Sequence, residues 1–245
     1  MFVILCGKTA SGKDTISKYL QENYNFIPII PITDRPMRDG ETEGVEYYFK
    51  TPSDFSKLIN SNEFIEYREY KTKIKNNPAI FRYGTPKFDL EHGKDYVTIS
   101  VLSAAEILKE YGGVEAVVYY LDTPDEVREA RCNRRGDFDK DEWERRLKAD
   151  TIDFADDKVN AVCDYTLYSN DNIKTKELAD LIIADCINHQ ECLNSIIEEM
   201  IRWFFLKKIT TFIFIYSITY IVRIFSFMYL AVSDTSIKFY LGTAI

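Results

Sequence analysis

The sequence has little of what defines several specialised protein classes. Its 245 residues include only 10 glycines and 7 prolines, which excludes a collagen-like or low-complexity chain. Its five cysteines form no Cys-x-x-Cys pair, so they favour a reducing compartment over a disulfide scaffold or a zinc site. Only two histidines are present, His92 and His189. Neither belongs to a recognisable catalytic constellation, and we interpret both as structural or solvated.

Positive charge is also scarce. The chain has 31 lysines and arginines against 39 aspartates and glutamates, which gives a net charge of −8. A protein that coats nucleic-acid phosphates normally shows a basic face, so we expect no nucleic-acid partner. The chain opens on the apolar run Phe2–Leu5 without a basic segment followed by a cleavable apolar stretch. This argues against a secretory signal and predicts a cytoplasmic protein.

Hydrophobic residues make up 46% of the chain, which excludes a disordered protein and suits one sizeable domain, with or without an appendage. The mean hydropathy of −0.24 conceals two compositions. Residues 201–245 hold five basic residues, one acid and twelve aromatics. Their net charge is therefore +4, which leaves −12 for residues 1–200. We accordingly divide the chain into a body at 1–190 and a tail at 200–245.

The tail contains a long apolar run. Residues 209–232 are interrupted by a single charge, Arg223, and about 20 residues suffice to cross a bilayer. Lys207 and Lys208 before the run favour a cytoplasmic N-terminal side. The composition is compatible with a membrane anchor, with a hydrophobic helix pair that binds a partner, and with an extension that plays no part in activity.

The body alternates short apolar strands with amphipathic helices. This predicts an α/β fold with a parallel sheet, into which the polar region 34–77 is inserted as a lobe. We expect strands at Phe2–Leu5, Phe26–Ile32, Tyr47–Phe49, Phe64–Tyr67, Tyr96–Val101, Ala116–Leu121 and Tyr165–Tyr168. Helices are expected at Lys13–Gln21, Pro52–Ile59, Ser103–Tyr111, Pro124–Asn133, Lys140–Asp157 and Thr175–His189.

The segment between the first strand and the first helix reads GKTASGKDT. The pattern GxxxxGK in this context is that of a phosphate loop (P-loop). Its glycines let successive backbone N–H groups curl around phosphates, and the helix N-terminus adds a favourable dipole. The motif therefore predicts ATP binding, with Lys13 reaching the β- and γ-phosphates. The predicted ATP-binding residues are Gly7, Lys8, Thr9, Ala10, Ser11, Gly12, Lys13, Asp14 and Thr15.

Asp14 departs from this pattern, which normally has Ser or Thr at its position for contact with Mg²⁺. An aspartate can hold Mg²⁺ through oxygen, directly or through water. We therefore expect Mg²⁺ as the cofactor and treat Asp14 as its hypothetical ligand.

Arg35 and Arg38 stand three residues apart in the stretch TDRPMRDGE. Two guanidinium groups at this spacing can clamp a second phosphate. Together with Gly44–Phe49, the stretch resembles the TTRxxRxGExxGxxYxF lobe of the guanylate kinase family. Further ordered blocks are similar to that family's F-[IL]-E, YG[ST], lid-arginine and DYxIxN motifs. These blocks are Phe64-Ile65-Glu66, Tyr83-Gly84-Thr85, then Arg131, Arg135 and Arg146, and finally Asp164-Tyr165.

The resemblance implies a P-loop three-layer fold over residues 1–190. It places a nucleoside-monophosphate-binding lobe at about 33–88 and a helical lid at about 130–147. It also implies ATP-dependent phosphorylation of GMP or dGMP. In this interpretation Glu66 and Thr85 face guanine, whose N1–H and N2 amino group are adjacent donors for a carboxylate. The acceptor's phosphate is held by Arg35, Arg38, Tyr47 and Tyr83, and the transferring group by Lys13, Arg131, Arg135 and Arg146.

Three departures from the family pattern leave the specificity open. Pro31 replaces a serine, Thr98-Ile99-Ser100 stands where D-I-D is usual, and Lys71–Arg82 is longer and more basic than the family's short turn. Ser100 can hydrogen-bond the base but cannot replace a carboxylate's charge. A broader deoxynucleoside monophosphate kinase and a non-catalytic interaction module therefore stay as alternatives. Individually, the arginines could be solvated or salt-bridged, Glu66 an exposed strand carboxylate, and the tyrosines packing residues.

Overall fold

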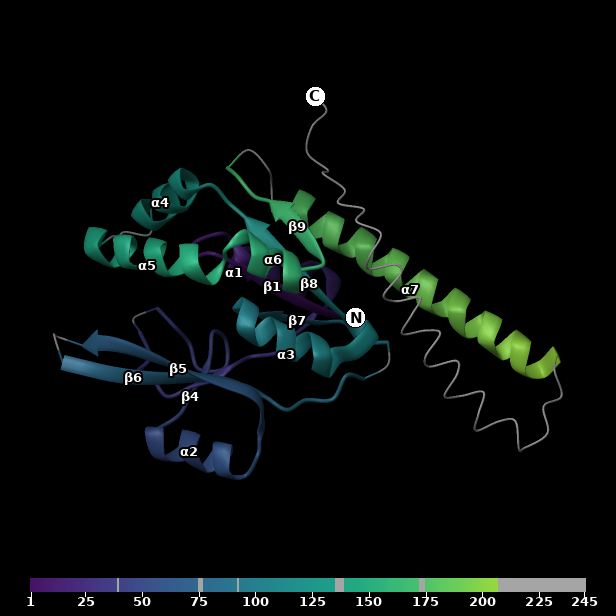
Figure 1. Ribbon diagram of the computed structural model, residues 1–245, viewed down its shortest axis with the longest axis horizontal. Helices are drawn as coiled ribbons and strands as arrows, with labels where there is room; N and C mark the ends of the chain where they lie inside the picture. Colours follow the sequence, from purple (N-terminus) through teal and green to yellow (C-terminus); the bar gives the residue numbers. More distant parts are fainter. Residues whose placement is uncertain (39, 75–76, 92, 135–138, 172–174, 207–245) are drawn as a thin grey trace. The chain divides into compact units, whose positions relative to one another are not determined.

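The computed structural model describes residues 1–38, 40–74, 77–91, 93–134, 139–171 and 175–206 (Figure 1). The chain divides into two compact units, Met1–Ile182 and Ile183–Ile245. The described part of the second unit is the C-terminal portion of helix α7 (Thr175–Leu206). All other elements discussed below belong to the first unit.

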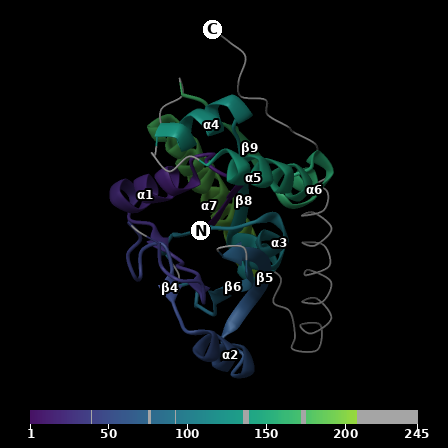
Figure 2. The same ribbon diagram turned by 90° about the vertical axis from the view of Figure 1, so that its left-hand side faces the viewer.

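The centre of the first unit is a five-stranded sheet in the order β2-β7-β1-β8-β9, in which every pairing is parallel. Strand β1 is central, and its six residues are all buried, as expected for a strand covered on both faces. Helix α1 lies on one side of the sheet, and α3 and α6 lie on the other (Figure 2). This three-layer arrangement confirms the predicted α/β fold with a parallel sheet. The strands are β1 (Phe2–Gly7), β2 (Ile27–Pro28), β7 (Tyr96–Ile99), β8 (Ala116–Asp122) and β9 (Tyr165–Tyr168), and the helices are α1 (Lys13–Tyr24), α3 (Leu102–Gly112), η1 (Gly113–Glu115), α4 (Asp125–Arg134), α5 (Lys140–Asp153) and α6 (Asp156–Val162).

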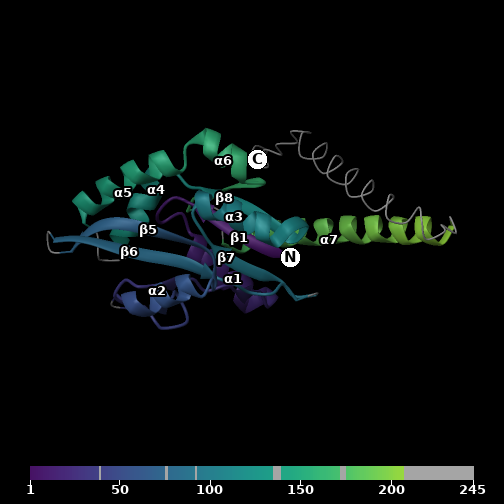
Figure 3. The same cartoon turned by 60° about the horizontal axis from the view of Figure 1, so that its bottom comes forward.

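A second, four-stranded sheet forms the lobe between β2 and β7, in the order β4-β3-β6-β5. Most of it is a long antiparallel hairpin of β5 and β6, which Figure 3 shows side by side. The lobe has its own small core of Ile32, Phe55 and Phe64. Its elements are β3 (Ile32–Thr33), β4 (Tyr48–Phe49), α2 (Pro52–Asn60), β5 (Phe64–Ile74) and β6 (Asn77–Pro86).

Two strand predictions in the lobe region were wrong. The segment Phe26–Ile32 is not one strand, because β2 joins the central sheet and β3 joins the lobe sheet. Pro28 and Pro31 have no N–H to donate to a continuous ladder, which explains the break between the sheets. The strand expected at Phe64–Tyr67 is longer than predicted, because β5 continues to Ile74. Residues 71–74 and 77–82 belong to the β5–β6 ladder, and an antiparallel sheet of this kind can face water on one side.

The predicted helix Lys140–Asp157 is also wrong in one respect, because it is two helices. Helix α5 ends at Asp153, and α6 begins at Asp156. Phe154 leaves the helical conformation and is buried, with its ring stacked 5.7 Å from the ring of Tyr120 in β8. Burial of an aromatic ring outweighs the loss of a few helical hydrogen bonds at this point.

Helix α7 begins where the sequence predicts but continues past His189 to Leu206. Among the helices of the described part, none has a stretch long and apolar enough to cross a membrane. The predicted apolar segment 209–232 lies outside the described residues.

Candidate active site

The loop from β1 to α1 curls tightly, as the glycine pattern predicts. At Gly7, where φ is +154°, a Cβ would lie 2.8 Å from the Ser11 Oγ and 2.9 Å from the Leu121 carbonyl oxygen, so only glycine fits. Gly12 has a φ of +106° and caps the start of α1, and Ala10 also adopts a positive φ of 58°. The backbone is therefore held in the curled form that presents N–H groups to an anion.

Lys13 occupies the mouth of this loop. Its Nζ donates to the carbonyl oxygens of Gly7 at 2.8 Å and Lys8 at 2.9 Å, and to the Ser11 Oγ at 3.3 Å. Burial lowers the pKa of Lys13, and the negative charge of Asp14 is the largest of the effects that raise it again. The ammonium group thus sits in a place where the charge of a phosphate would stabilise it more strongly than neutral carbonyls do.

A buried ion pair that sequence reasoning missed ties the loop to the helices α4 and α5. Arg128 is fully buried, and its Nη1 donates to the Thr9 carbonyl at 2.9 Å and to the Asp150 Oδ2 at 2.7 Å. The same carboxylate accepts the Thr9 N–H at 2.9 Å. Arg128 stands one helical turn before the predicted Arg131, a spacing that places both on one face of α4 and could have indicated its role.

The three predicted lid arginines have different positions. Arg131 does reach the phosphate loop, where its Nη1 donates to the Ser11 carbonyl at 2.9 Å and to the Ala10 carbonyl at 3.3 Å. Arg146 instead donates to Glu142 at 2.6 Å. Arg145 also pairs with Glu142, and hydrogen bonds from these two arginines, Arg145 foremost, lower the pKa of Glu142 to about 2. Arg135 lies outside the described residues.

In the lobe, Arg35 is almost wholly buried. Its guanidinium donates to the Glu41 carboxylate at 2.7 Å and to the Pro36 carbonyl at 2.9 Å, and it lies over the Tyr47 ring at 5.0 Å. The rings of Tyr47 and Tyr83 are 5.6 Å apart. The hydrogen bond from Arg35 is the main reason that the pKa of Glu41 is lowered. The structure therefore brings together three of the four residues predicted to hold the acceptor's phosphate.

Arg38, the fourth of these residues, is exposed at the rim of this cluster. Its backbone N–H donates to the Glu41 Oε2 at 2.8 Å, so one carboxylate orders both arginines of the clamp. A second ion pair in the lobe, between Asp34 and Arg82, was not predicted from the sequence. The Asp34 carboxylate accepts from the Arg82 Nε at 2.6 Å and from the Arg82 backbone N–H at 2.7 Å.

The residues predicted to face the base form a buried pair. Glu66 and Thr85 are opposite each other in the β5–β6 ladder, and the Thr85 hydroxyl donates to the Glu66 Oε1 at 2.6 Å. Ser100 is buried directly after β7, where its N–H donates to the Leu5 carbonyl at 3.0 Å. Thr98 is buried as well, and its hydroxyl donates to the Ile29 carbonyl at 3.1 Å. The Thr98 hydroxyl is thus already hydrogen-bonded within the protein.

The donor set for Mg²⁺ is small. Asp14 is exposed in the first turn of α1, directly after Lys13. Over the residues that the structure describes, no three His, Cys, Asp or Glu side chains come together as a metal cage. Mg²⁺ in nucleotide sites is normally held by one or two carboxylates together with substrate phosphates and water. A single carboxylate beside the phosphate loop fits that mode of binding.

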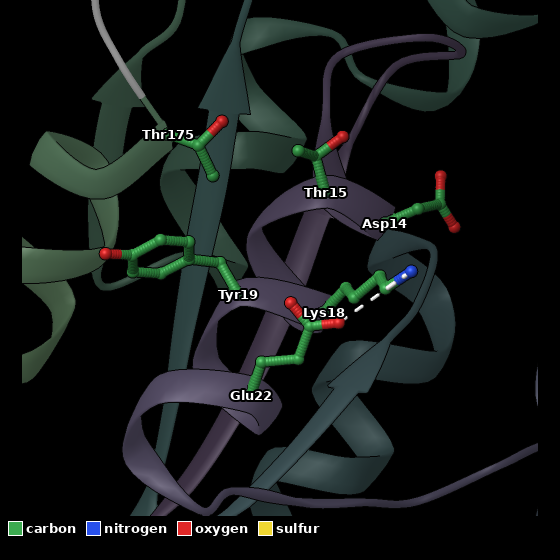
Figure 4. Close-up of a pocket in the computed structure, with 6 residues that line it drawn as sticks. All are labelled: Asp14, Thr15, Lys18, Tyr19, Glu22 and Thr175. Atoms are coloured by element: carbon green, nitrogen blue, oxygen red, sulfur yellow. Dashed lines mark ion pairs between the residues drawn. The ribbon is translucent and has the colours of Figure 1, made fainter.

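A recess of about 380 Å³ opens beside the first turns of α1. Figure 4 shows Tyr19 and Thr175 on one side of it and the Asp14 carboxylate on the other, next to the ion pair of Lys18 and Glu22. Its lining residues are Asp14, Thr15, Lys18, Tyr19, Glu22 and Thr175.

Comparison with known proteins shows which family the chain is similar to. The family model described as guanylate kinase matches residues 1–77, which include the phosphate loop and the arginine clamp. A guanylate kinase of Bacteroides thetaiotaomicron is 37% identical over 141 residues, which are 55% of this chain and 64% of that protein. The chain is therefore similar to the guanylate kinase family, most clearly over residues 1–77. This confirms the resemblance seen in the sequence.

A second member of the guanylate kinase family, from Leifsonia xyli subsp. xyli, is 30% identical over 158 residues, which are 62% of this chain and 59% of that protein. The chain thus matches about three fifths of the length of these curated relatives. The crystal structure of a guanylate kinase from Anaplasma phagocytophilum superposes with a TM-score of 0.54 at 22% identity, over 78% of this chain and 86% of that one. This likeness establishes the shared fold.

Proposed function

We propose that the protein transfers the γ-phosphoryl group of ATP to GMP or dGMP and so produces ADP and GDP or dGDP. The observation that carries this proposal is the presence of two phosphate-binding arrangements in one compact unit. One is the curled loop around Lys13, and the other is the buried Arg35 with its neighbours Tyr47 and Tyr83. Two such arrangements suit an enzyme that brings two polyanions together.

The reaction needs positioning more than acid–base chemistry. An oxygen of the acceptor's phosphate attacks the γ-phosphorus of ATP, and the bond from that phosphorus to the β–γ bridging oxygen breaks, which leaves ADP. The second pKa of a phosphate monoester is about 6, so the attacking oxygen is largely anionic at neutral pH and no side-chain base is required. Lys13 neutralises charge on the donor, while Arg35 and Arg38 hold the acceptor in line. Mg²⁺, which Asp14 would hold together with the substrates' phosphates, would supply further charge neutralisation there.

In the structure, two of the predicted lid arginines contact groups of the protein itself. Arg146 is paired with Glu142, and Arg131 contacts the carbonyls of the phosphate loop. We propose that the nucleotides' phosphates compete for these guanidinium groups when both substrates are bound, because a phosphate offers more charge than a carbonyl. The recess beside α1, with the Tyr19 ring at its edge, supports a place for the nucleoside part of ATP.

The first test is a nucleotide panel with the full chain, ATP and Mg²⁺. We expect kcat/KM for GMP and dGMP to exceed that for AMP, CMP and dTMP by at least about tenfold, since a single good polar contact to a base is worth about that much. ADP release without any acceptor is the control for simple hydrolysis. A preference for another monophosphate would contradict guanine specificity, and a complete lack of transfer would favour the non-catalytic module.

Asp14 provides a second prediction. If its carboxylate helps to hold Mg²⁺, Asp14→Ala should raise the Mg²⁺ concentration needed for half-maximal activity by about tenfold, the lower end of what loss of one supporting group costs a metal site. The matched control is Glu106→Ala, which removes an exposed carboxylate on α3. An unchanged Mg²⁺ dependence in Asp14→Ala would mean that the substrates and water hold the metal without it.

The cellular location is also a proposal. Substrates such as ATP and GMP favour the cytoplasm, and the apolar segment 209–232 adds the option of attachment to the cytoplasmic side of a membrane. The same panel assay, run on the soluble and membrane fractions of cells that express the full chain, separates the two. Activity confined to the soluble fraction would argue against an anchor.

A further inference from the structure

Two charged side chains next to the predicted base site, Glu66 and the partly buried Arg68, have buried atoms without hydrogen-bond partners. Among the described residues, the buried side-chain atoms that have no hydrogen-bond partner are Glu66 Oε2, Arg68 Nε, Arg68 Nη1 and Arg128 Nε. The first three belong to one ion pair, in which Arg68 Nη1 and Glu66 Oε2 are 3.4 Å apart. Their side chains are 21% and 2% exposed, respectively.

Arg68 shares a face of the lobe sheet with the predicted substrate residues. It follows Glu66 by two positions in β5, and alternate residues of a strand point to the same face. Its cross-strand neighbour is Tyr83, while that of Glu66 is Thr85. Tyr70, two positions further on, has its ring 5.4 Å from the Tyr83 ring. The sequence resemblance assigned Glu66, Tyr83 and Thr85 to the substrate but gave Arg68 no role.

Buried charged groups without hydrogen bonds are costly, and each one in a folded protein calls for an explanation. The ion pair neutralises charge, but at 3.4 Å it does not satisfy the donors of Arg68 or the second oxygen of Glu66. A ligand would satisfy the Arg68 donors and the Glu66 oxygen if it offered an acceptor to Arg68 and, on a neighbouring group, a donor to Glu66. Arginine has donors only and a carboxylate has acceptors only, so the order of these groups on the ligand is determined.

The Watson–Crick edge of a 6-oxopurine has this order, because the O6 acceptor is next to the N1–H donor. Adenine has the opposite order, with an amino donor at position 6 and an acceptor at N1, and its amino group would oppose Arg68. We infer that Arg68 is a base-recognising residue, which donates to O6 of a 6-oxopurine nucleoside monophosphate while Glu66 accepts from N1–H. The inference rests on the proposed function and identifies the residue that reads position 6 of the base.

The test is equilibrium binding by calorimetry, without ATP, of GMP, IMP and the monophosphate of 2-aminopurine riboside, which lacks O6. In Arg68→Met, GMP and IMP should bind about 10- to 100-fold more weakly, the usual effect of losing a hydrogen bond to a charged group. Binding of the 2-aminopurine nucleotide should change by less than about threefold, because it offers no O6 to lose. Arg68→Lys, which keeps a charged donor, should recover part of the loss.

The matched control is Lys71→Met, which removes an exposed basic residue from the same strand and should leave all three affinities unchanged. A structural role of Arg68 would weaken the three ligands equally, and that result would overturn the inference. So would a wild-type chain that binds GMP and the 2-aminopurine nucleotide equally well or binds neither. If Arg68→Met does not fold, the comparison of Arg68→Lys with wild type over the same ligands replaces it.

This binding test separates the inference from the proposed function. Selective loss of O6-dependent binding in Arg68→Met, combined with no phosphoryl transfer by the wild type, would support base recognition and reject the kinase activity. Normal transfer to GMP by a variant that binds GMP as tightly as the wild type would support the activity and reject the role of Arg68.

Discussion

Lys13→Met should lower kcat for phosphoryl transfer by about a thousandfold or more, the range seen when one charged group that stabilises a transferring phosphoryl is removed. The Lys13 ammonium sits at the mouth of the phosphate loop, within 2.9 Å of the carbonyl oxygens of Gly7 and Lys8. It is therefore placed to meet the donor's phosphates as charge develops on the bridging oxygen. Steady-state kinetics over a range of ATP and GMP concentrations measures the effect.

The same variant should not be less stable than the wild type. Burial lowers the pKa of Lys13, which means that the charged form is disfavoured in the folded state and opposes folding at neutral pH. Thermal unfolding checks this expectation. The kinetic control is Lys57→Met on α2, where the side chain is 74% exposed and activity should be unchanged. A Lys13→Met enzyme with more than about a tenth of wild-type kcat would reject its role.

Arg128→Met and Asp150→Leu should each destabilise the protein by about 3–5 kcal/mol. The first leaves the buried Asp150 carboxylate without its cation, and the second leaves the wholly buried Arg128 with only the half-exposed Asp125 as an ion-pair partner. For a protein of this size, the loss corresponds to a fall in Tm of roughly 6–20 °C. The ion pair is 2.7 Å long, and the Arg128 side chain is wholly buried. Both residues also bind the backbone of Thr9, so kcat/KM for ATP should fall with stability in each variant.

The double variant Arg128→Met/Asp150→Leu separates the effect of unpaired buried charge on stability from the effect of the lost Thr9 hydrogen bonds on activity. Without either charge, it should recover a good part of the lost stability, while Thr9 still lacks its anchors and kcat/KM for ATP stays low. The control is Arg145→Ala, which breaks an exposed pair with Glu142 and should cost at most about 1 kcal/mol. Single variants as stable as Arg145→Ala, or a double variant with full activity, would contradict the assigned role.

Much of the candidate site could be predicted because its signals are local. The phosphate loop is nine consecutive residues whose glycines and lysine determine its conformation, and the structure shows Gly7 and Gly12 with the positive φ values that the loop requires. The clamp of Arg35 and Arg38 depends on a short spacing, and one carboxylate, Glu41, contacts both. Short motifs of this kind keep their meaning without knowledge of the rest of the chain.

Other features escaped prediction because they depend on partners distant in the sequence. The sequence predicts a short strand at Phe64–Tyr67, but pairing with β6 extends β5 to Ile74 as part of a long hairpin. The helix expected over 140–157 is broken at Phe154, whose ring packs on Tyr120 in a strand more than thirty residues earlier. In both cases the gain from a long-range contact exceeds the local preference of the segment.

The sequence alone was sufficient for the parallel α/β fold, the resemblance to guanylate kinases, the glycine pattern of the phosphate loop and the order of the remaining motifs, since periodicity and short motifs carry that information. Only the tertiary structure could decide which charged residues are buried. In the sequence, Arg68, Arg128 and Asp150 look like ordinary surface charges. In the fold, Arg128 and Asp150 join the phosphate loop to the helices α4 and α5, and Arg68 lies against Glu66 beside the predicted base site. Burial is the reason for the difference, because a charge removed from water must find its partner within the protein or on a ligand.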